Sequence, residues 1–293
     1  MTNNLVNLAY SHVDVFSQSP FGGNGLPVFI DAPDLSAEQM LRITQEMRYF
    51  EAIFLQPAGQ PGTVRARIFD LFDELPFAGH PIIGAAAVLH KRSGVSGAQT
   101  RRFQLPSKTV EITTDVTAGG YSGLLDQGAP EFLRSIADSA RVAAAFNLAT
   151  DDLAPDLPLE VVSTGLRYLI VPVRPGVLAR ARISHDITEL VQRAGAQFAV
   201  LLDDAAVEVR HWNNDGIIED VATGSAAGTI GAYRLRHGLV RGGNTFTLNQ
   251  GQYTGRPSTL RVQPEGTANR VETVKVGGDV AFVGHGMIEA LPG

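Results

Sequence analysis

The chain has 293 residues, of which 44% are hydrophobic and 18% charged, so it can bury a large core and is too apolar to be disordered. Thirty acidic and 24 basic residues give a net charge of −6 without any Lys/Arg block, which argues against nucleic acid or an anionic membrane as a partner. The absence of Cys excludes disulfides, thiolate metal sites and cysteine nucleophiles. No apolar run approaches the roughly 20 residues that cross a bilayer, and no signal-peptide pattern opens the sequence, so we expect a cytoplasmic protein.

Two short β-prone runs open the chain. They are residues 12–16 (HVDVF) and 26–31 (LPVFID), with the turn formers SQSPFGGNG between them, and this order predicts a hairpin with a long, glycine-rich tip. Residues 34–47 (DLSAEQMLRITQEM) then place apolar side chains on one flank. That pattern is typical of a surface amphipathic helix, with Ser36 or Asp34 as its N-cap.

A buried helix is predicted in the middle of the first half. Residues 51–57 (EAIFLQP) predict a strand ended by its proline, and residues 63–70 (TVRARIFD) alternate as a half-exposed strand does. In the next segment, ELPFAGHPIIGAAAVLH, small residues from Gly84 onward cover nearly every side of a helix, which a surface helix would not tolerate. Segments 101–116 and 120–130 resemble strands, and the end of the second is a reasonable linker.

The second half of the chain repeats the first. TGLRYLIVPV matches NGLPVFIDAP at an offset of 140 residues, with Gly165 on Gly25, and EDVATGSAAGTIGAYRL matches ELPFAGHPIIGAAAVLH at an offset of 145, with Gly224 on Gly79. The segment DITELVQRAGAQFAVLLDD also repeats the helix-then-strand order of DLSAEQMLRITQEMRYFEAIFLQP. Duplication explains three matches better than the alternative, convergent helix starts on two unrelated domains.

The repeat predicts two domains. We place an N-terminal lobe at residues 1–127, completed by a C-terminal strand at 279–293, and a C-terminal lobe at 128–278. The expected class is α+β, with two pseudo-symmetric domains, each a curved antiparallel β-sheet or barrel wrapped around a central helix. The N-termini of the two central helices would then face one another across a cleft.

Those two helix entrances carry the residues that we expect to bind an anion. A helix N-terminus has unpaired N–H groups and about half a positive charge, so Gly79 with His80, and Gly224 with Ser225, would form two donor clusters for an anionic substrate. Glycine at each entrance allows a ligand to approach the backbone closely.

Three polar side chains are candidates for acid–base chemistry. Glu51 opens an apolar strand, where desolvation would make it a usable base near neutral pH; the alternative is an exposed carboxylate at a strand end. His80 lies near a helix N-cap, which favours a neutral imidazole; the alternative is a capping His without a reaction. Asp220 precedes Gly224 by four residues and has Glu219 beside it, and one of these carboxylates could simply cap the turn.

Other chemical signals are weak. The remaining His residues show no paired spacing such as H-x₃-H, so we expect no metal site. GGNG and GGN lack the context and the Lys of a phosphate loop, and TGSAAG lacks the spacing of a nucleophile elbow. Trp212 could line a cleft, although packing in a core is the simpler interpretation.

At these residues the sequence resembles the PhzF family, the phenazine-biosynthesis isomerase group of the diaminopimelate epimerase-like fold. The motifs that carry the resemblance span nearly the whole chain: VDVFSQSPFGGNGLPVFID, ELPFAGHPIIGAAA, EDVATGSAAGTIGAYRLRHG and NQGQYTGRPS. The resemblance implies two similar halves with the active site between them. It also implies that Glu51, His80 and Asp220 are catalytic and that Gly79, Gly224 and Ser225 bind the substrate, because these residues stand at the family's motif positions.

The same resemblance implies a cofactor-independent isomerisation of trans-2,3-dihydro-3-hydroxyanthranilate or a related small carboxylate, carried out by a homodimer. Tyr49 and Phe50 depart from the N-L-S that commonly precedes the family's glutamate, which keeps open a different reaction, such as cyclisation or dehydration of an unrelated metabolite. Another alternative is an idle protein that binds a small acid, although such a protein would be expected to lack Glu51. A two-base racemase of the same fold would use a Cys pair, which this chain does not have.

Overall fold

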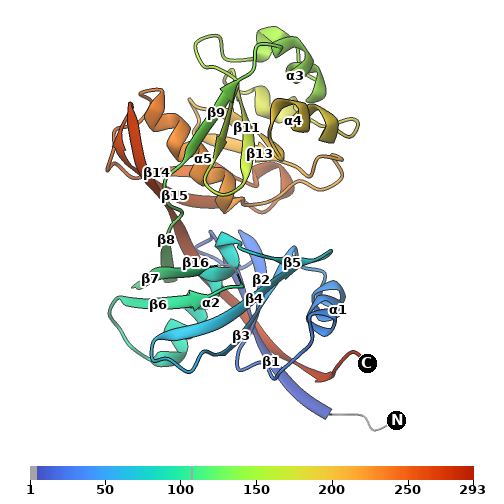
Figure 1. Ribbon diagram of the computed structural model, residues 1–293, viewed down its shortest axis with the longest axis vertical. Helices are drawn as coiled ribbons and strands as arrows, with labels where there is room; N and C mark the ends of the chain where they lie inside the picture. Colours follow the sequence, from blue (N-terminus) through green and yellow to red (C-terminus); the bar gives the residue numbers. More distant parts are fainter. Residues whose placement is uncertain (1–4, 107) are drawn as a thin grey trace. The chain divides into compact units, whose positions relative to one another are not determined.

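The computed structural model describes residues 5–106 and 108–293 (Figure 1). The chain divides into two compact units: unit 1 comprises Met1–Leu125 with Gly277–Gly293, and unit 2 comprises Asp126–Val276. Residues 1–4, at the start of the expected N-terminal lobe, and Ser107, within the expected strand segment 101–116, lie outside the described residues.

In its described residues, unit 1 combines a β-sheet with two helices (Figure 1). Its elements are β1 (Leu5–Val15), β2 (Asn24–Phe29), α1 (Ala37–Met47), β3 (Glu51–Pro57), β4 (Thr63–Asp70), β5 (Glu74–Leu75), α2 (Gly79–Ser93), β6 (Gln99–Gln104), β7 (Thr109–Thr117), β8 (Gly120–Asp126) and the last part of β16 (Arg270–Ala290). β1 and β2 form the predicted hairpin, with Val15 opposite Asn24. The last part of β16 pairs with β1; Ile288, for example, lies opposite Leu8.

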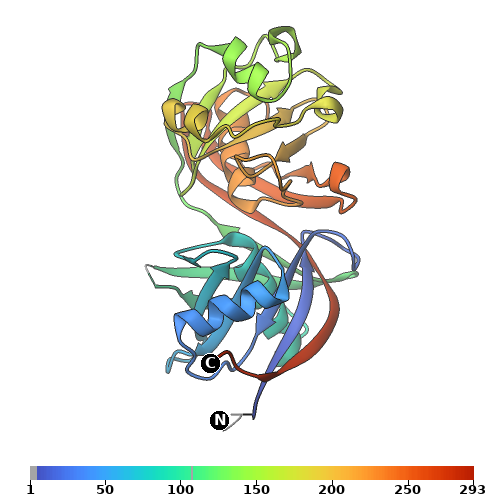
Figure 2. The same ribbon diagram turned by 90° about the vertical axis from the view of Figure 1, so that its right-hand side faces the viewer.

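The first helix, α1, begins where its sequence predicts. The Ser36 hydroxyl accepts a hydrogen bond from the Gln39 N–H, and the Gln39 side chain accepts one from the Ser36 N–H, which makes a capping box. The helix buries Met40 and Ile43 and lies against β3 and β4 (Figure 2). Its apolar flank shares one core cluster with Phe54 of β3, so the amphipathic prediction is confirmed.

The second helix, α2, is buried on nearly every side, as its small residues predict. All residues from His80 to Val88 are buried. A Cβ on Gly84 would lie 2.6 Å from Leu26 and 3.0 Å from Val15, so glycine is needed where the helix meets the hairpin. Leu26 faces α2, whereas Phe29, three positions along β2, packs with α1. Because strand side chains alternate, the two helices cover opposite faces of the sheet.

The sheet of unit 1 is mixed. β1–β2, β3–β4, β6–β7 and β7–β8 are antiparallel, whereas β2 is parallel to β3 and β4 is parallel to β6. The α+β class is confirmed, but the expectation of wholly antiparallel pairing within it is wrong. α1 returns the chain across the sheet between the parallel strands β2 and β3, and α2 does so between β4 and β6, after the short antiparallel strand β5.

Unit 2 has the same kinds of element. They are β9 (Glu131–Ser135), α3 (Ser139–Ala145), η1 (Thr150–Asp152), β10 (Glu160–Ser163), β11 (Arg167–Val173), η2 (Val177–Arg180), α4 (Thr188–Ala194), β12 (Phe198–Asp203), β13 (Glu208–His211), α5 (Gly224–Arg236), β14 (Phe246–Gln250), η3 (Gln252–Thr254), β15 (Ser258–Thr267) and the first part of β16.

The strand pairing of unit 2 repeats that of unit 1. β10–β11 is antiparallel, β11–β12 parallel across α4, β12–β13 antiparallel, β13–β14 parallel across α5, and β14–β15 antiparallel. This is the order found from β1 to β7 in unit 1. The repeat seen in the sequence therefore extends to the direction of each strand.

The core of unit 2 also explains two features of its sequence. α5 is buried like α2: a Cβ on Gly231 would lie 2.6 Å from Val262 and 2.8 Å from Val274. Trp212 is 6% exposed and lies in the main apolar cluster, 6.5 Å from the ring of Phe146, so it packs in the core.

No helix within the described part of the chain is long and apolar enough to cross a membrane.

Candidate active site

The α2 entrance is the name used below for Glu51, Gly79 and His80 of unit 1. α2 begins at Gly79, and its N-cap, Ala78, has an extended backbone (φ −147°, ψ 136°) and provides no side-chain cap. The first N–H groups of a helix have no partner within the helix. The nearest atom to a Cβ built on Gly79 belongs to Leu125, 3.9 Å away, so the glycine leaves room beside these donors.

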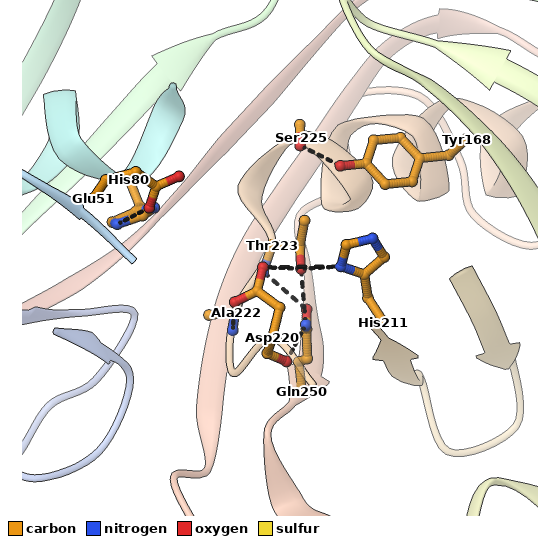
Figure 3. Close-up of polar contacts among 9 residues, drawn as sticks. All are labelled: Glu51, His80, Tyr168, His211, Asp220, Ala222, Thr223, Ser225 and Gln250. Carbon is orange, nitrogen blue, oxygen red and sulfur yellow. Dashed lines mark hydrogen bonds and ion pairs between the residues drawn. The ribbon is translucent and has the colours of Figure 1, made fainter. Parts of the chain in front are cut away.

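Glu51 and His80 are in direct contact at this entrance (Figure 3). Oε2 of Glu51 lies 3.1 Å from Nε2 of His80, and the two side chains are 19% and 7% exposed. The alternative of a carboxylate in bulk water at position 51 is therefore wrong. A carboxylate and an imidazole at this distance can share a proton and pass it to a third group.

Tyr49, which precedes this site in sequence, belongs to the other face of the sheet. Its ring lies 3.1 Å from a Cβ built on Gly25, and its hydroxyl is 3.3 Å from Nδ1 of His12. On the same two strands, Val13 and Leu26 face α2. Because side chains alternate along a strand, Tyr49 lies on the face away from α2.

The α5 entrance is the name used below for Asp220, Gly224 and Ser225 of unit 2. The Asp220 carboxylate accepts a hydrogen bond from the Thr223 hydroxyl at 2.6 Å and from the Ala222 N–H at 3.2 Å. Thr223 is the N-cap residue of α5. Asp220 thus organises the turn that leads into the helix, as one of the alternatives expected, whereas the Glu219 carboxylate accepts from Arg210.

Thr223 connects Asp220 to two further side chains (Figure 3). Its hydroxyl accepts from Nε2 of Gln250 at 2.9 Å, and Oε1 of Gln250 accepts from the Thr223 N–H at 3.0 Å. With its own proton on Asp220, the hydroxyl oxygen has one lone pair left for His211, whose Nδ1 is 3.3 Å away. His211 is therefore the Nδ1–H tautomer. Burial lowers the pKa of His211, which keeps the ring neutral.

Gly224 and Ser225 open α5, and both make polar contacts. The Ser225 hydroxyl lies 2.8 Å from the Tyr168 hydroxyl, where either oxygen can be the donor (Figure 3). The Gly224 carbonyl accepts from Nε2 of Gln127 at 2.9 Å, and Oε1 of Gln127 accepts from the Thr164 hydroxyl at 2.8 Å. The first turn of α5 is therefore held in place by side chains from separate parts of unit 2.

The structure brings the predicted site residues together in two groups of three. Glu51, Gly79 and His80 meet in unit 1, and Asp220, Gly224 and Ser225 meet in unit 2. Sequence reasoning missed the polar residues that support the second group: Gln127, Thr164, Tyr168, His211, Thr223 and Gln250. Thr223 and Gln250 stand inside the motifs ATGSAAG and NQGQYTGRPS, which was the only signal for them.

Within residues 5–106 and 108–293, no three His, Asp or Glu side chains gather as the ligands of a metal ion do. What the two entrances offer chemically is proton transfer, hydrogen-bond donation and a pair of helix N-termini.

Comparison with known proteins agrees with the motifs. A family model described as phenazine biosynthesis-like protein matches residues 13–286. A trans-2,3-dihydro-3-hydroxyanthranilate isomerase from Pseudomonas aeruginosa is 32% identical over 289 residues, covering 94% of this chain and 98% of its own length.

Solved structures extend the comparison to the fold. One described as a predicted epimerase, also from Pseudomonas aeruginosa, is 43% identical with a TM-score of 0.88, and the match covers 96% of this chain and 99% of that one. A probable proline racemase from Agrobacterium radiobacter shares the fold at 13% identity, with a TM-score of 0.59 and coverage of 96% and 92%.

Proposed function

Since this chain belongs to the phenazine biosynthesis-like family and is an isomerase of the PhzF type, we propose that it moves a proton within a small unsaturated carboxylate. Trans-2,3-dihydro-3-hydroxyanthranilate is the first candidate substrate, because the relative from Pseudomonas aeruginosa is named for it. Catalysis would be of the general acid–base type. Cofactor independence and a homodimeric state, which the family resemblance implies, and a cytoplasmic location, which we expect from the sequence, stay predictions.

Glu51 is the proposed base, and its contact with His80 is the observation that supports this most strongly. In the proposed reaction the Glu51 carboxylate removes a proton from a carbon next to the unsaturated system. The electron pair of that C–H bond moves into the unsaturated system, and a proton is added at another carbon. No atom is gained or lost. His80, 3.1 Å from the carboxylate, holds or receives the proton between the two steps.

The remaining predicted residues are assigned to binding and to the protonation of the far side of the substrate. Gly79, Gly224 and Ser225 lie in the first turns of α2 and α5, where helix N–H groups favour a carboxylate or a developing oxyanion. Asp220, ordered by Thr223, is proposed to hold or help to protonate the substrate.

A solvent deuterium experiment tests the proposal. In D₂O, the wild type is expected to wash deuterium into trans-2,3-dihydro-3-hydroxyanthranilate, while Glu51→Gln binds the compound without exchange. Loss of a positioned base costs about 10²–10⁴-fold in rate. The matched control is Glu46→Gln on the exposed side of α1, which should exchange as fast as the wild type. Equal exchange in Glu51→Gln and wild type would refute the role of Glu51, and tight binding without exchange by the wild type would refute the isomerisation.

The alternative of a different reaction was based on Tyr49 and Phe50. Tyr49 packs on Gly25 and His12, on the face away from α2. The contacts of Tyr49 therefore give this alternative no support.

A further inference from the structure

An arginine–glutamate pair precedes each helix entrance with the same geometry. In unit 1, Nε and Nη2 of Arg67 donate to the two Glu74 oxygens at 2.7 and 2.6 Å. In unit 2, Nε and Nη2 of Arg210 donate to the two Glu219 oxygens at 2.8 and 2.6 Å. Such two-pronged charged pairs fix direction as well as distance. Each glutamate stands five residues before the glycine that begins the helix.

The backbone around the two pairs is also equivalent. Phe69 lies opposite Glu74 in the β4–β5 ladder, and Trp212 lies opposite Glu219 in an isolated bridge. Each arginine lies over the ring two residues later, at 5.2 Å for Phe69 and 4.4 Å for Trp212. The frame is therefore the same in both units.

One position of the frame differs in its chemistry. In unit 1 the residue after the glutamate is Leu75, opposite Ile68. In unit 2 the residue after the glutamate is Asp220, whose N–H donates to the His211 carbonyl at 2.9 Å. The frame that positions a leucine in unit 1 thus positions the predicted acid in unit 2.

Arg210 is held more firmly than its counterpart. Besides the two bonds to Glu219, its Nη1 donates to the carbonyls of Leu178 and Ala181 at 2.6 and 3.0 Å. Its guanidinium also lies 4.3 Å from the ring of Tyr253. The side chains of Arg210 and Glu219 are 9% and 13% exposed, against 18% and 24% for Arg67 and Glu74. Arg210 and the glutamate that it holds therefore have more partners and less exposure than Arg67 and Glu74.

We propose that Arg210 and Glu219 are positioning residues for the carboxylate of Asp220, acting through the short backbone link between positions 219 and 220. The inference rests on the proposed function, which gives Asp220 a role toward the substrate. Glu219 points to the arginine while Asp220, next in the chain, points to Thr223. Rotation of the Glu219 backbone would therefore move the Asp220 carboxylate directly.

The test compares the two frames within one protein. Glu219→Gln removes the charge of the buried pair at constant volume, and Glu74→Gln makes the same change where no acid follows. Both variants are expected to lose thermal stability. Glu219→Gln is expected to lower kcat for deuterium exchange into trans-2,3-dihydro-3-hydroxyanthranilate by about 10- to 100-fold, the cost of a misplaced catalytic group, with KM changed less than about threefold. Glu74→Gln is expected to keep kcat within about threefold of the wild type.

A second variant covers the case in which Glu219→Gln does not fold. Arg210→Met/Glu219→Met removes both charges and keeps apolar volume, a change that buried ion pairs often tolerate, and it is expected to fold with the same loss of kcat. Unchanged kcat in either folded variant, or equal losses in Glu219→Gln and Glu74→Gln, would overturn the inference.

Asp220→Asn, measured alongside, separates this inference from the proposed function. If Asp220→Asn loses exchange while Glu219→Gln keeps it, only the positioning role is wrong. If Asp220→Asn exchanges at the wild-type rate, the proposed role of Asp220 is wrong and the positioning role falls with it.

Discussion

At the α2 entrance an imidazole contacts a carboxylate directly, with His80 3.1 Å from Glu51. At the α5 entrance Asp220 accepts hydrogen bonds from a hydroxyl and an N–H, and Nδ1 of His211 is 3.9 Å from its carboxylate. Both entrances begin with a glycine at the first position of a buried helix. The first is suited to moving a proton, and the second to holding one polar group in a fixed direction.

The difference shows how a duplicated frame can acquire two kinds of chemistry. Ile68 and Leu75 form an apolar pair in unit 1, and His211 and Asp220 occupy the corresponding places in unit 2. The two positions thus carry different chemistry on equivalent backbone.

The largest expected effect is on the exchange rate, and it comes from comparing substitutions in the first turns of α2 and α5. His80→Gln should lower the rate of exchange into trans-2,3-dihydro-3-hydroxyanthranilate by about 10²–10⁴-fold, because glutamine cannot carry a proton between steps. Ser225→Ala removes one hydroxyl bonded to Tyr168 and should cost about 1 kcal/mol, or about fivefold. Steady-state exchange rates measure both. Similar losses in the two variants would mean that the entrances share the proton chemistry.

Helix packing provides the next comparison, since each central helix meets its sheet through a glycine. Gly84→Ala would push a methyl group to within 2.6 Å of Leu26, and Gly231→Ala to within 2.6 Å of Val262. We expect each to lower the free energy of unfolding by about 1–3 kcal/mol, even though alanine favours helix by about 1 kcal/mol. Thermal unfolding checks this, with the exposed Glu46→Ala of α1 as control. Unchanged stability in both variants would show that the helices can move away from their sheets.

The smallest expected effect concerns His211, whose place in the frame of unit 1 is taken by Ile68. Burial lowers its folded pKa below the ordinary 6.5, so below pH 6.5 the unfolded chain binds a proton that the folded chain does not. The contribution of His211 to the free energy of unfolding is therefore constant above pH 6.5. As the pH decreases below 6.5, the free energy of unfolding decreases by up to about 1.4 kcal/mol for each pH unit.

The variant His211→Asn keeps a side-chain N–H and cannot titrate, so it should remove this part of the slope. The measurement is urea unfolding between pH 7.5 and 5.5. It can be followed by the fluorescence of Trp212, the one Trp of the chain, which lies in the core of unit 2. Equal slopes in the variant and the wild type would contradict the prediction.

Local patterns were enough to predict most elements that lead to the two entrances. The hairpin of β1 and β2, the capping box of Ser36 and the buried α2 all depend on residues close together in sequence. The parallel pairing of β2 with β3 was missed because it depends on the crossover helix between them. The alternation of apolar and polar side chains along a strand does not predict which strand lies beside it.

The residues that support the α5 entrance could not be predicted for a related reason. Tyr168 and Ser225 are 57 positions apart, and Gln250 reaches Thr223 across 27. Such contacts exist only after the sheet has formed, and no local spacing encodes them. The roles of Glu51, His80 and Asp220 came from motifs and stay predictions until they are measured.

The long strand β16 has a consequence for synthesis of the protein. Unit 2 is one continuous stretch of chain, whereas unit 1 receives β16 only after all of unit 2 has been made. Because this strand pairs with β1 along Val15 to Leu8, a nascent chain on the ribosome holds an unfinished first sheet while the second unit can already close. The unit whose synthesis begins first is thus the one that finishes folding last, and the edge of β1 is open to pairing with other chains during that interval.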